Sequence, residues 1–170
     1  KIDSAEARNV ETVAKNAQLY NPKARVIKAE SVLLLDKPEL IKGKRVLVIE
    51  DGPTTTHGDM RTGAAYVAAE RYGAGEIVDP RPWVTGKIKE TFSAYPNIGK
   101  LLPAMGYGPD QVKDLEETIN RVDCDVVVIG TPIDLGRFIK INKPHVRVRY
   151  DLSVKAKDEL KDMMREKGLI

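Results

Sequence analysis

The sequence has little of what marks secreted, membrane-spanning or nucleic-acid-binding proteins. One cysteine, Cys124, stands among 170 residues, so no internal disulfide can form, and the apolar run that follows it indicates a buried thiol in a reducing compartment. No apolar run approaches the roughly 18 residues of a membrane span, and no signal peptide is recognisable. The 28 basic and 25 acidic residues nearly balance, which gives no electrostatic case for nucleic acid as the main partner. We expect a cytoplasmic protein that binds neither membrane nor nucleic acid.

The phosphate-binding loop G-x-x-x-x-G-K-[ST] is also missing. The pairs Gly43-Lys44, Gly86-Lys87 and Gly99-Lys100 lack both its upstream glycine at the right distance and its following hydroxyl. This chain is therefore not expected to hold a nucleoside triphosphate by that device. A zinc site is excluded as well, because His57 has no second histidine or cysteine nearby at ligand spacing.

What is present suits one globular core. The chain is 42% hydrophobic, and its length suits one domain or a little more. Lys1 is not a methionine and leads straight into Ile2-Asp3, so we expect that a preceding segment has been removed.

The stretch from Arg45 to Tyr66 organises the chain. Its apolar run, Val46–Ile49, has no alternation and is bounded by turn residues, which is typical of a parallel strand buried on both faces. The run stops at two carboxylates, Glu50 and Asp51, and passes through a loop into a helix rich in small residues. In open α/β sheets such strand-to-helix loops line the crevice where ligands bind.

Similar units recur along the chain. Strands are predicted at 25–29, 46–49, 76–78, 125–129 and 145–150, and a short apolar segment lies at 32–35. Helices are predicted after Ser4 as far as Asn21-Pro22, over about 60–72, from Thr85 to Tyr95, from Pro109 to Val122 and after Ser153. This alternation predicts an α/β fold: a mostly parallel, doubly wound, Rossmann-like sheet with helices on both faces.

Four loops should then leave the same edge of the sheet, at 50–58, 79–83, 105–108 and 130–134. They carry hydroxyls, carboxylates, an arginine and a histidine, and the polar residues among them are Glu50, Asp51, Thr54, Thr55, Thr56, His57, Asp79, Arg81, Tyr107, Thr131 and Asp134. Hydroxyls and helix N–H groups bind phosphoryl oxygens, carboxylates hold magnesium, and a guanidinium neutralises charge. The edge is suited to phosphate and magnesium.

Each residue also has a plainer interpretation. The run 50–53 is compatible with simple turn chemistry, and the hydroxyls of 54–56 with local bonds to the backbone. Asp79 and Asp134 are candidate caps, Arg81 lies between two prolines in what a surface turn would also explain, and His145 begins a strand as a structural residue would.

Several blocks resemble an archaeal family that comprises cyclic 2,3-diphosphoglycerate synthetase and relatives labelled predicted GTPases. The resemblance is to the carboxyl-terminal half of that family and runs from Lys1 to about Tyr150. Its blocks are KGKRVLVIEDGP at 42–53, THG at 56–58, VDPRP at 78–82, LPAMGYG at 102–108 and GTPIDL at 130–135.

The resemblance implies a P-loop nucleotide-binding domain upstream in the same polypeptide. That domain ends in an Asn/Thr-Lys-x-Asp motif that reads the base, and Lys1 and Asp3 match two of its positions. Residues 1–30 would then be the tail of the upstream domain, and 31–170 a carboxyl-terminal α/β domain. The implied reaction is an ATP-dependent, magnesium-requiring closure of a phosphoanhydride in 2,3-diphosphoglycerate, and this chain alone is expected to be inactive.

These considerations predict a domain of an ATP- or GTP-dependent phosphoryl-transfer enzyme that binds a phosphorylated acidic substrate. The roles predicted are catalysis for His57, Asp79 and Arg81; phosphate binding for Thr54, Thr55, Thr56, Gly58, Tyr107 and Thr131; base binding for Lys1 and Asp3; and magnesium binding for Glu50, Asp51 and Asp134. Two alternatives stay open, a GTPase-type switch without a small-molecule product and a scaffold that forms a homodimer.

Overall fold

The computed structural model describes residues 2–3, 5–58, 60–105 and 108–170. The chain divides into two compact units, each described here by itself. Unit 1 comprises Lys1–Leu33 and Tyr150–Ile170, and unit 2 comprises Leu34–Arg149. The predicted assignment of residues 1–30 to an upstream domain and of 31–170 to the α/β domain stays a prediction.

Unit 2 alternates strands and helices. Its elements are η1 (Pro38–Leu40), β2 (Arg45–Asp51), α2 (Gly52–Thr56), α3 (Ala64–Arg71), β3 (Glu76–Ile77), η2 (Arg81–Trp83), α4 (Gly86–Ala94), β4 (Leu102–Ala104), α5 (Pro109–Arg121), β5 (Val126–Ile129) and η3 (Leu135–Arg137). Unit 1 holds α1 (Ala7–Tyr20) and α6 (Val154–Glu166), and β1 (Ser31–Leu35) and β6 (His145–Leu152) each have residues in both units.

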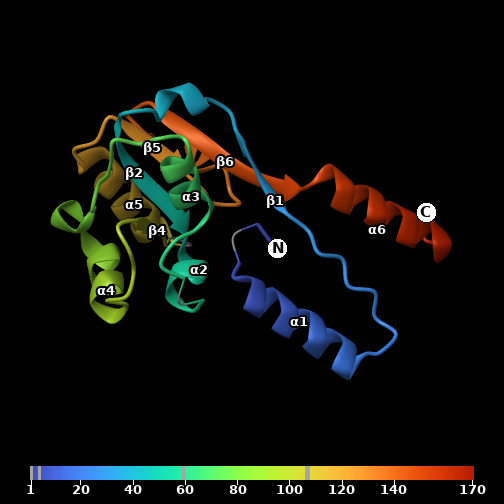
Figure 1. The fold of residues 1–170 in the computed structure, drawn as a ribbon. Helices are drawn as coiled ribbons and strands as arrows, with labels where there is room; N and C mark the ends of the chain where they lie inside the picture. Colours follow the sequence, from blue (N-terminus) through green and yellow to red (C-terminus); the bar gives the residue numbers. More distant parts are fainter. Residues whose placement is uncertain (1, 4, 59, 106–107) are drawn as a thin grey trace. The chain divides into compact units, whose positions relative to one another are not determined.

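The strands form one sheet in the order β1-β6-β5-β2-β3, with β4 also paired to β2. The pairings of β2 with β3, β4 and β5, and of β5 with β6, are all parallel. Figure 1 shows α3 on one face of this sheet and α5 on the other. The predicted α/β fold with a mostly parallel sheet is confirmed.

Strand β2 is the centre of the core. Its residues Val46–Ile49 are fully buried and pair in register with Val126–Ile129 of β5. Unbroken apolar sequence is what a parallel strand needs when helices cover both faces. The strand was predicted at this position, and it extends to include both carboxylates, Glu50 and Asp51.

The register decides which loops share an edge. Asp51 pairs with Ala104, and Ile49 with Ile129, so β2, β4 and β5 end within two residues of one another at the same edge, from which the loops 50–58 and 130–134 leave as predicted. Strand β3 differs, because Ile77 pairs with Val46 near the beginning of β2. The 79–83 loop therefore leaves the sheet nearer to its middle than the other three loops do.

Helix α3 packs closely on the sheet because Ala65, Ala68 and Ala69 are small and buried. It begins at Ala64, later than the predicted start near Met60. The chain after β2 instead enters the short helix α2 at once, since Pro53 suits a first helical turn. Gly73, at φ 73°, follows the end of α3 as predicted.

Three other predictions need correction or lie outside the description. Residues 25–29 are not a strand, and in this segment the Ala29 carbonyl accepts a hydrogen bond from the Ile2 N–H at 2.9 Å. Strand β4 was missed, because Pro103 argues against a strand; β4 is only a short strand alongside β2. Ser4, the predicted cap of α1, lies outside the described residues, and Glu6 occupies the N-cap.

Unit 1 contrasts with unit 2 in burial. None of the fourteen residues of α1, all of them described, is buried, and α6 buries Ala156. Within the described part of the chain, no helix is long and apolar enough to cross a membrane.

Candidate functional site

Glu50 is a carboxylic acid enclosed in the core at the end of β2. Its side chain is 2% exposed, and its Oε1 accepts a hydrogen bond from the Tyr66 N–H at 2.8 Å, in the first turn of α3. Burial raises the pKa of Glu50 to about 7, and the N–H groups of residues 63–66 oppose this by favouring the charged form. The carboxylate thus occupies the positive end of the α3 dipole.

Two glycines make room for this carboxylate. A Cβ added at Gly63 would overlap the Glu50 carboxylate, and one at Gly130 would lie 2.8 Å from both Glu50 Oε2 and the Ala65 nitrogen. Glu50 is therefore enclosed by backbone from α3 and from the loop after β5.

Gly63→Ala should consequently destabilise unit 2 by about 1–3 kcal/mol, because the new methyl group must push Glu50 away from the helix. Urea unfolding of the chain, followed by the fluorescence of Trp83, measures the effect. Gly136→Ala is the matched control, since its Cβ would meet Asp134 at an ordinary 3.6 Å. In a Glu50→Ala background the effect of Gly63→Ala should largely vanish; an equal loss in both backgrounds would contradict this explanation.

Glu50 and Asp51 do not act as a pair, which corrects their joint assignment to magnesium. Successive side chains of a strand point to opposite faces, so the two carboxylates diverge. Asp51 accepts a hydrogen bond from the Thr54 hydroxyl at 3.1 Å and is partly exposed, whereas Glu50 is committed to α3. Asp134, the third predicted ligand, accepts hydrogen bonds elsewhere, as described below. Among the described residues, no group of three or more His, Cys, Asp or Glu side chains could hold a metal ion.

The hydroxyls of α2 are used locally. Thr55 and Thr56 are buried, and each donates a hydrogen bond to the Gly52 carbonyl at 2.9 Å. Thr54 donates to Asp51. The geometry therefore favours the plainer of the two interpretations for Thr55 and Thr56. Gly58, exposed after α2, donates its N–H to the Pro53 carbonyl at 3.1 Å.

Two of the three residues predicted to be catalytic contact aromatic rings of α4 or of the residue that follows it. His57, exposed at the end of α2, contacts the ring of Tyr95 edge-on, with ring centroids 5.9 Å apart. The guanidinium carbon of Arg81 lies 4.9 Å from the centroid of Phe92. Phe92 lies within α4, and Tyr95 is the residue that directly follows the end of this helix. We call His57, Asp79 and Arg81 with these two rings the α4 cluster.

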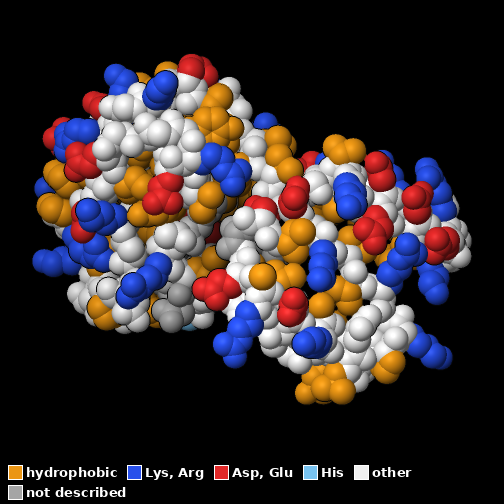
Figure 2. Space-filling model, viewed as in Figure 1, with side chains coloured by type: hydrophobic (Ala, Val, Ile, Leu, Met, Phe, Trp, Pro, Cys, Tyr) orange, Lys and Arg blue, Asp and Glu red, His pale blue; other side chains and the backbone are white. Residues whose placement is uncertain are grey.

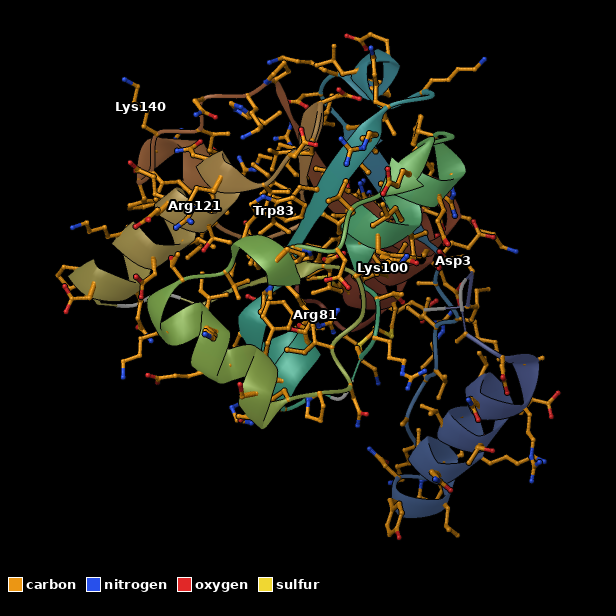
Figure 3. The ribbon with its side chains drawn as sticks, turned by 90° about the vertical axis from the view of Figure 1, so that its left-hand side faces the viewer. Asp3, Arg81, Trp83, Lys100, Arg121 and Lys140 are labelled. Atoms are coloured by element: carbon orange, nitrogen blue, oxygen red, sulfur yellow. The ribbon has the colours of Figure 1, made fainter. Side chains whose placement is uncertain are left out.

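Arg81 is held from three directions. One Nη donates to Asp79 at 2.8 Å, the other Nη donates to the Ile98 carbonyl, and the planar face lies over Phe92. Asp79 also accepts the Arg81 N–H at 3.1 Å, which closes a small ring of bonds in the 79–81 turn. Figure 3 shows Arg81 beside α4. The side chains of Asp79 and Arg81 stay 37% and 38% exposed, so a ligand can reach both.

Thr131 and Asp134 lie in the loop after β5 and have partners of their own. The Thr131 hydroxyl donates to the Ile133 carbonyl at 2.7 Å and is buried. Asp134 accepts from Arg147 of β6 at 3.2 Å and lies 3.6 Å from Arg137. Asp134 is thus part of an ion-pair group that links the 130–134 loop to β6.

The predicted base-binding residues belong to unit 1. Asp3 accepts a hydrogen bond from the Ser31 N–H at 2.9 Å, and Lys1 lies outside the described residues. Tyr107, predicted to bind phosphate, also lies outside them. Their assignment stays a prediction.

Sequence reasoning missed the residues that organise these side chains. Phe92 and Tyr95 fall within the helix predicted from Thr85 to Tyr95, but nothing in the sequence pairs them with Arg81 and His57. The ion pair of Arg147 with Asp134 was also missed, because it joins residues from two elements. For Glu50, a local signal exists in the small residues Gly63, Ala64 and Ala65 that begin α3, since they leave room for a carboxylate.

The sequence was compared with those of known proteins. The chain is similar to an arginine synthetase. The protein named arginine synthetase ArcE, from Thermococcus kodakarensis, is 55% identical over 166 residues, which make up 98% of this chain and 37% of that relative. No protein-family model matches the chain, and no solved structure matches it. The chain spans about 37% of the length of the curated relative, so the activity in that name belongs to a longer polypeptide.

Proposed function

We propose that this chain is a domain of an ATP- or GTP-dependent synthetase, in which phosphoryl transfer from the nucleotide activates the acceptor substrate. The observation that carries the proposal is the 55% identity, over nearly the whole chain, to a protein named as a synthetase of arginine. Activation by phosphate is shared by synthetases of different products, so it also accommodates the resemblance to cyclic 2,3-diphosphoglycerate synthetase. The nucleotide-binding P-loop would lie in another part of the same polypeptide.

In this proposal the α4 cluster contacts the transferred phosphoryl group or a phosphorylated substrate. Arg81 offers a half-exposed guanidinium whose direction is fixed by Asp79 and Phe92, and fixed positive charge is what stabilises phosphoryl transfer. His57 is exposed, contacts the ring of Tyr95, and supplies a donor or a general acid.

Magnesium would arrive with the nucleotide. Mg²⁺ in such enzymes is usually bound by one or two carboxylates together with substrate phosphates and water, so it needs no cage of protein ligands. Asp51, partly exposed at the edge of β2, fits this limited role, whereas Glu50 does not, because it is buried against α3.

A reaction panel on the protein at its full native length tests the proposal. With arginine, phosphate and either ADP or GDP, an arginine synthetase running in reverse should split a C–N bond of arginine into the amine and the phosphorylated acceptor, and pass that phosphoryl group to the nucleotide to form the matching triphosphate. With ATP or GTP, a cyclising enzyme should release phosphate only when 2,3-diphosphoglycerate is present. A rate of nucleotide hydrolysis that neither arginine nor 2,3-diphosphoglycerate changes would favour the GTPase-type switch. No nucleotide chemistry at all would favour the scaffold.

A further inference from the structure

Unit 1 has almost no core of its own. Among the described residues, Ala156 is its buried apolar side chain, whereas unit 2 supplies all the others. An isolated helix of the length of α1 is marginal in water, and helices in proteins draw most of their stability from a packed apolar face. Something outside unit 1 is needed to stabilise α1.

One side of α1 is suited to such packing. Val10, Val13, Ala14, Ala17 and Tyr20 recur at helical spacing and lie on one side of the helix, which we call the α1 face. Val13 is 67% exposed and Tyr20 is 86% exposed. Figure 2 shows hydrophobic side chains at the surface of this helix.

A cavity adjoins this face. Its volume is about 190 Å³, and the residues that line it include Ile2, Val10, Val13, Val26, Ile27 and Ala29. Most of these side chains are aliphatic, so the cavity is suited to an apolar side chain from another surface. Apolar patches of this kind on a soluble protein mark interaction sites.

We propose that the α1 face and its cavity dock another domain of the same polypeptide. The relative contains unit 1, because the match covers 98% of this chain, and more than half of the relative lies outside the match. A tethered domain is present at one copy per chain and at high effective concentration, whereas a second molecule must associate from solution. Unit 1 is thus an incomplete module whose core is finished by residues outside these 170. This inference does not depend on the nucleotide or the substrate.

Photo-crosslinking in the protein at its full native length tests the docking. A photoreactive phenylalanine analogue is placed at position 13 or, as the matched control, at position 138, because Phe138 is 66% exposed in unit 2. After irradiation, mass spectrometry maps the linked peptides. Mixing isotopically labelled and unlabelled protein separates links within one polypeptide from links between two.

The expected result is that position 13 links to residues outside this chain in the same polypeptide. Its crosslinking yield should be at least about tenfold higher than that of position 138, because a group at the centre of an interface faces the partner surface instead of solvent. Links between two copies would overturn the proposal in favour of a dimer. Links to residues 34–149, or equal yields at both positions, would overturn it as well.

A second measurement is independent of the analogue. Val13→Asp should lower the thermal midpoint of the protein at its full native length by several degrees, because it places a charge in a docked apolar face. Phe138→Asp should leave the midpoint nearly unchanged. Equal shifts for the two variants would contradict docking at α1.

Discussion

Replacing Glu50 with glutamine should remove a pH dependence from the stability of unit 2. Burial raises the pKa of Glu50 from 4.5 to about 7, so between these values the native state binds a proton that the unfolded chain releases. The contribution of Glu50 to stability is fully present below pH 4.5 and is lost as the pH rises through 7. The loss amounts to about 3 kcal/mol, at 1.36 kcal/mol per pKa unit.

Urea unfolding of the chain between pH 4.5 and 8, followed by Trp83 fluorescence, measures this effect. The stability of Glu50→Gln relative to the unchanged chain should rise by about 3 kcal/mol over that range, because glutamine has no proton to lose. The slope is the diagnostic quantity, since any packing difference adds a constant offset. Glu39→Gln, at an exposed position, is the control for the loss of a carboxyl group. Parallel curves for Glu50→Gln and the unchanged chain would show that Glu50 titrates normally.

Arg81→Ala should lower the turnover of the protein at its full native length by about 10²–10³-fold, the usual cost of removing a fixed group that stabilises transition-state charge. The fold should survive, because the ion pair with Asp79 is partly exposed and such pairs contribute about 1 kcal/mol or less. The stacking on Phe92 adds a similar amount. Steady-state kinetics with the active nucleotide, together with a thermal midpoint, separate the two effects.

Arg121→Ala is the matched control for this test. Arg121 is also an arginine in an ion pair, with Glu117 one helical turn away on α5, and Figure 3 shows it apart from Arg81. Its removal should leave turnover unchanged. Arg81→Lys should recover only part of the activity, because lysine keeps the charge but not the planar fork. Unchanged kinetics in Arg81→Ala would take Arg81 out of the site.

The fold was predictable from the sequence where local pattern and burial agree. The apolar run Val46–Ile49 predicts a buried parallel strand, which is β2. Pro109 and Ser153 correctly predict where α5 and α6 begin. The order of the strands was not predictable, because pairing depends on contacts between distant segments. The short β3, which leaves the sheet early, gives no local signal of its register.

The candidate site was predictable in part. Placing polar loops at the ends of β2 and β5 followed from strand direction alone, but the direction of each side chain did not. Glu50 and Asp51 are adjacent in sequence and point to opposite faces, and Thr55 and Thr56 turn their hydroxyls to the backbone. A sequence records which polar groups are present, while the partner that satisfies each group is chosen by packing.

Above pH 7, where its carboxyl group is ionised, Glu50 also gives helix α3 a counter-ion that travels with the polypeptide. A dissolved anion would have to displace a tethered group whose local concentration is on the order of millimolar or higher. Dilution, dialysis and the choice of buffer salt should therefore leave this end of the helix unchanged. Phosphate from a substrate must therefore be received elsewhere.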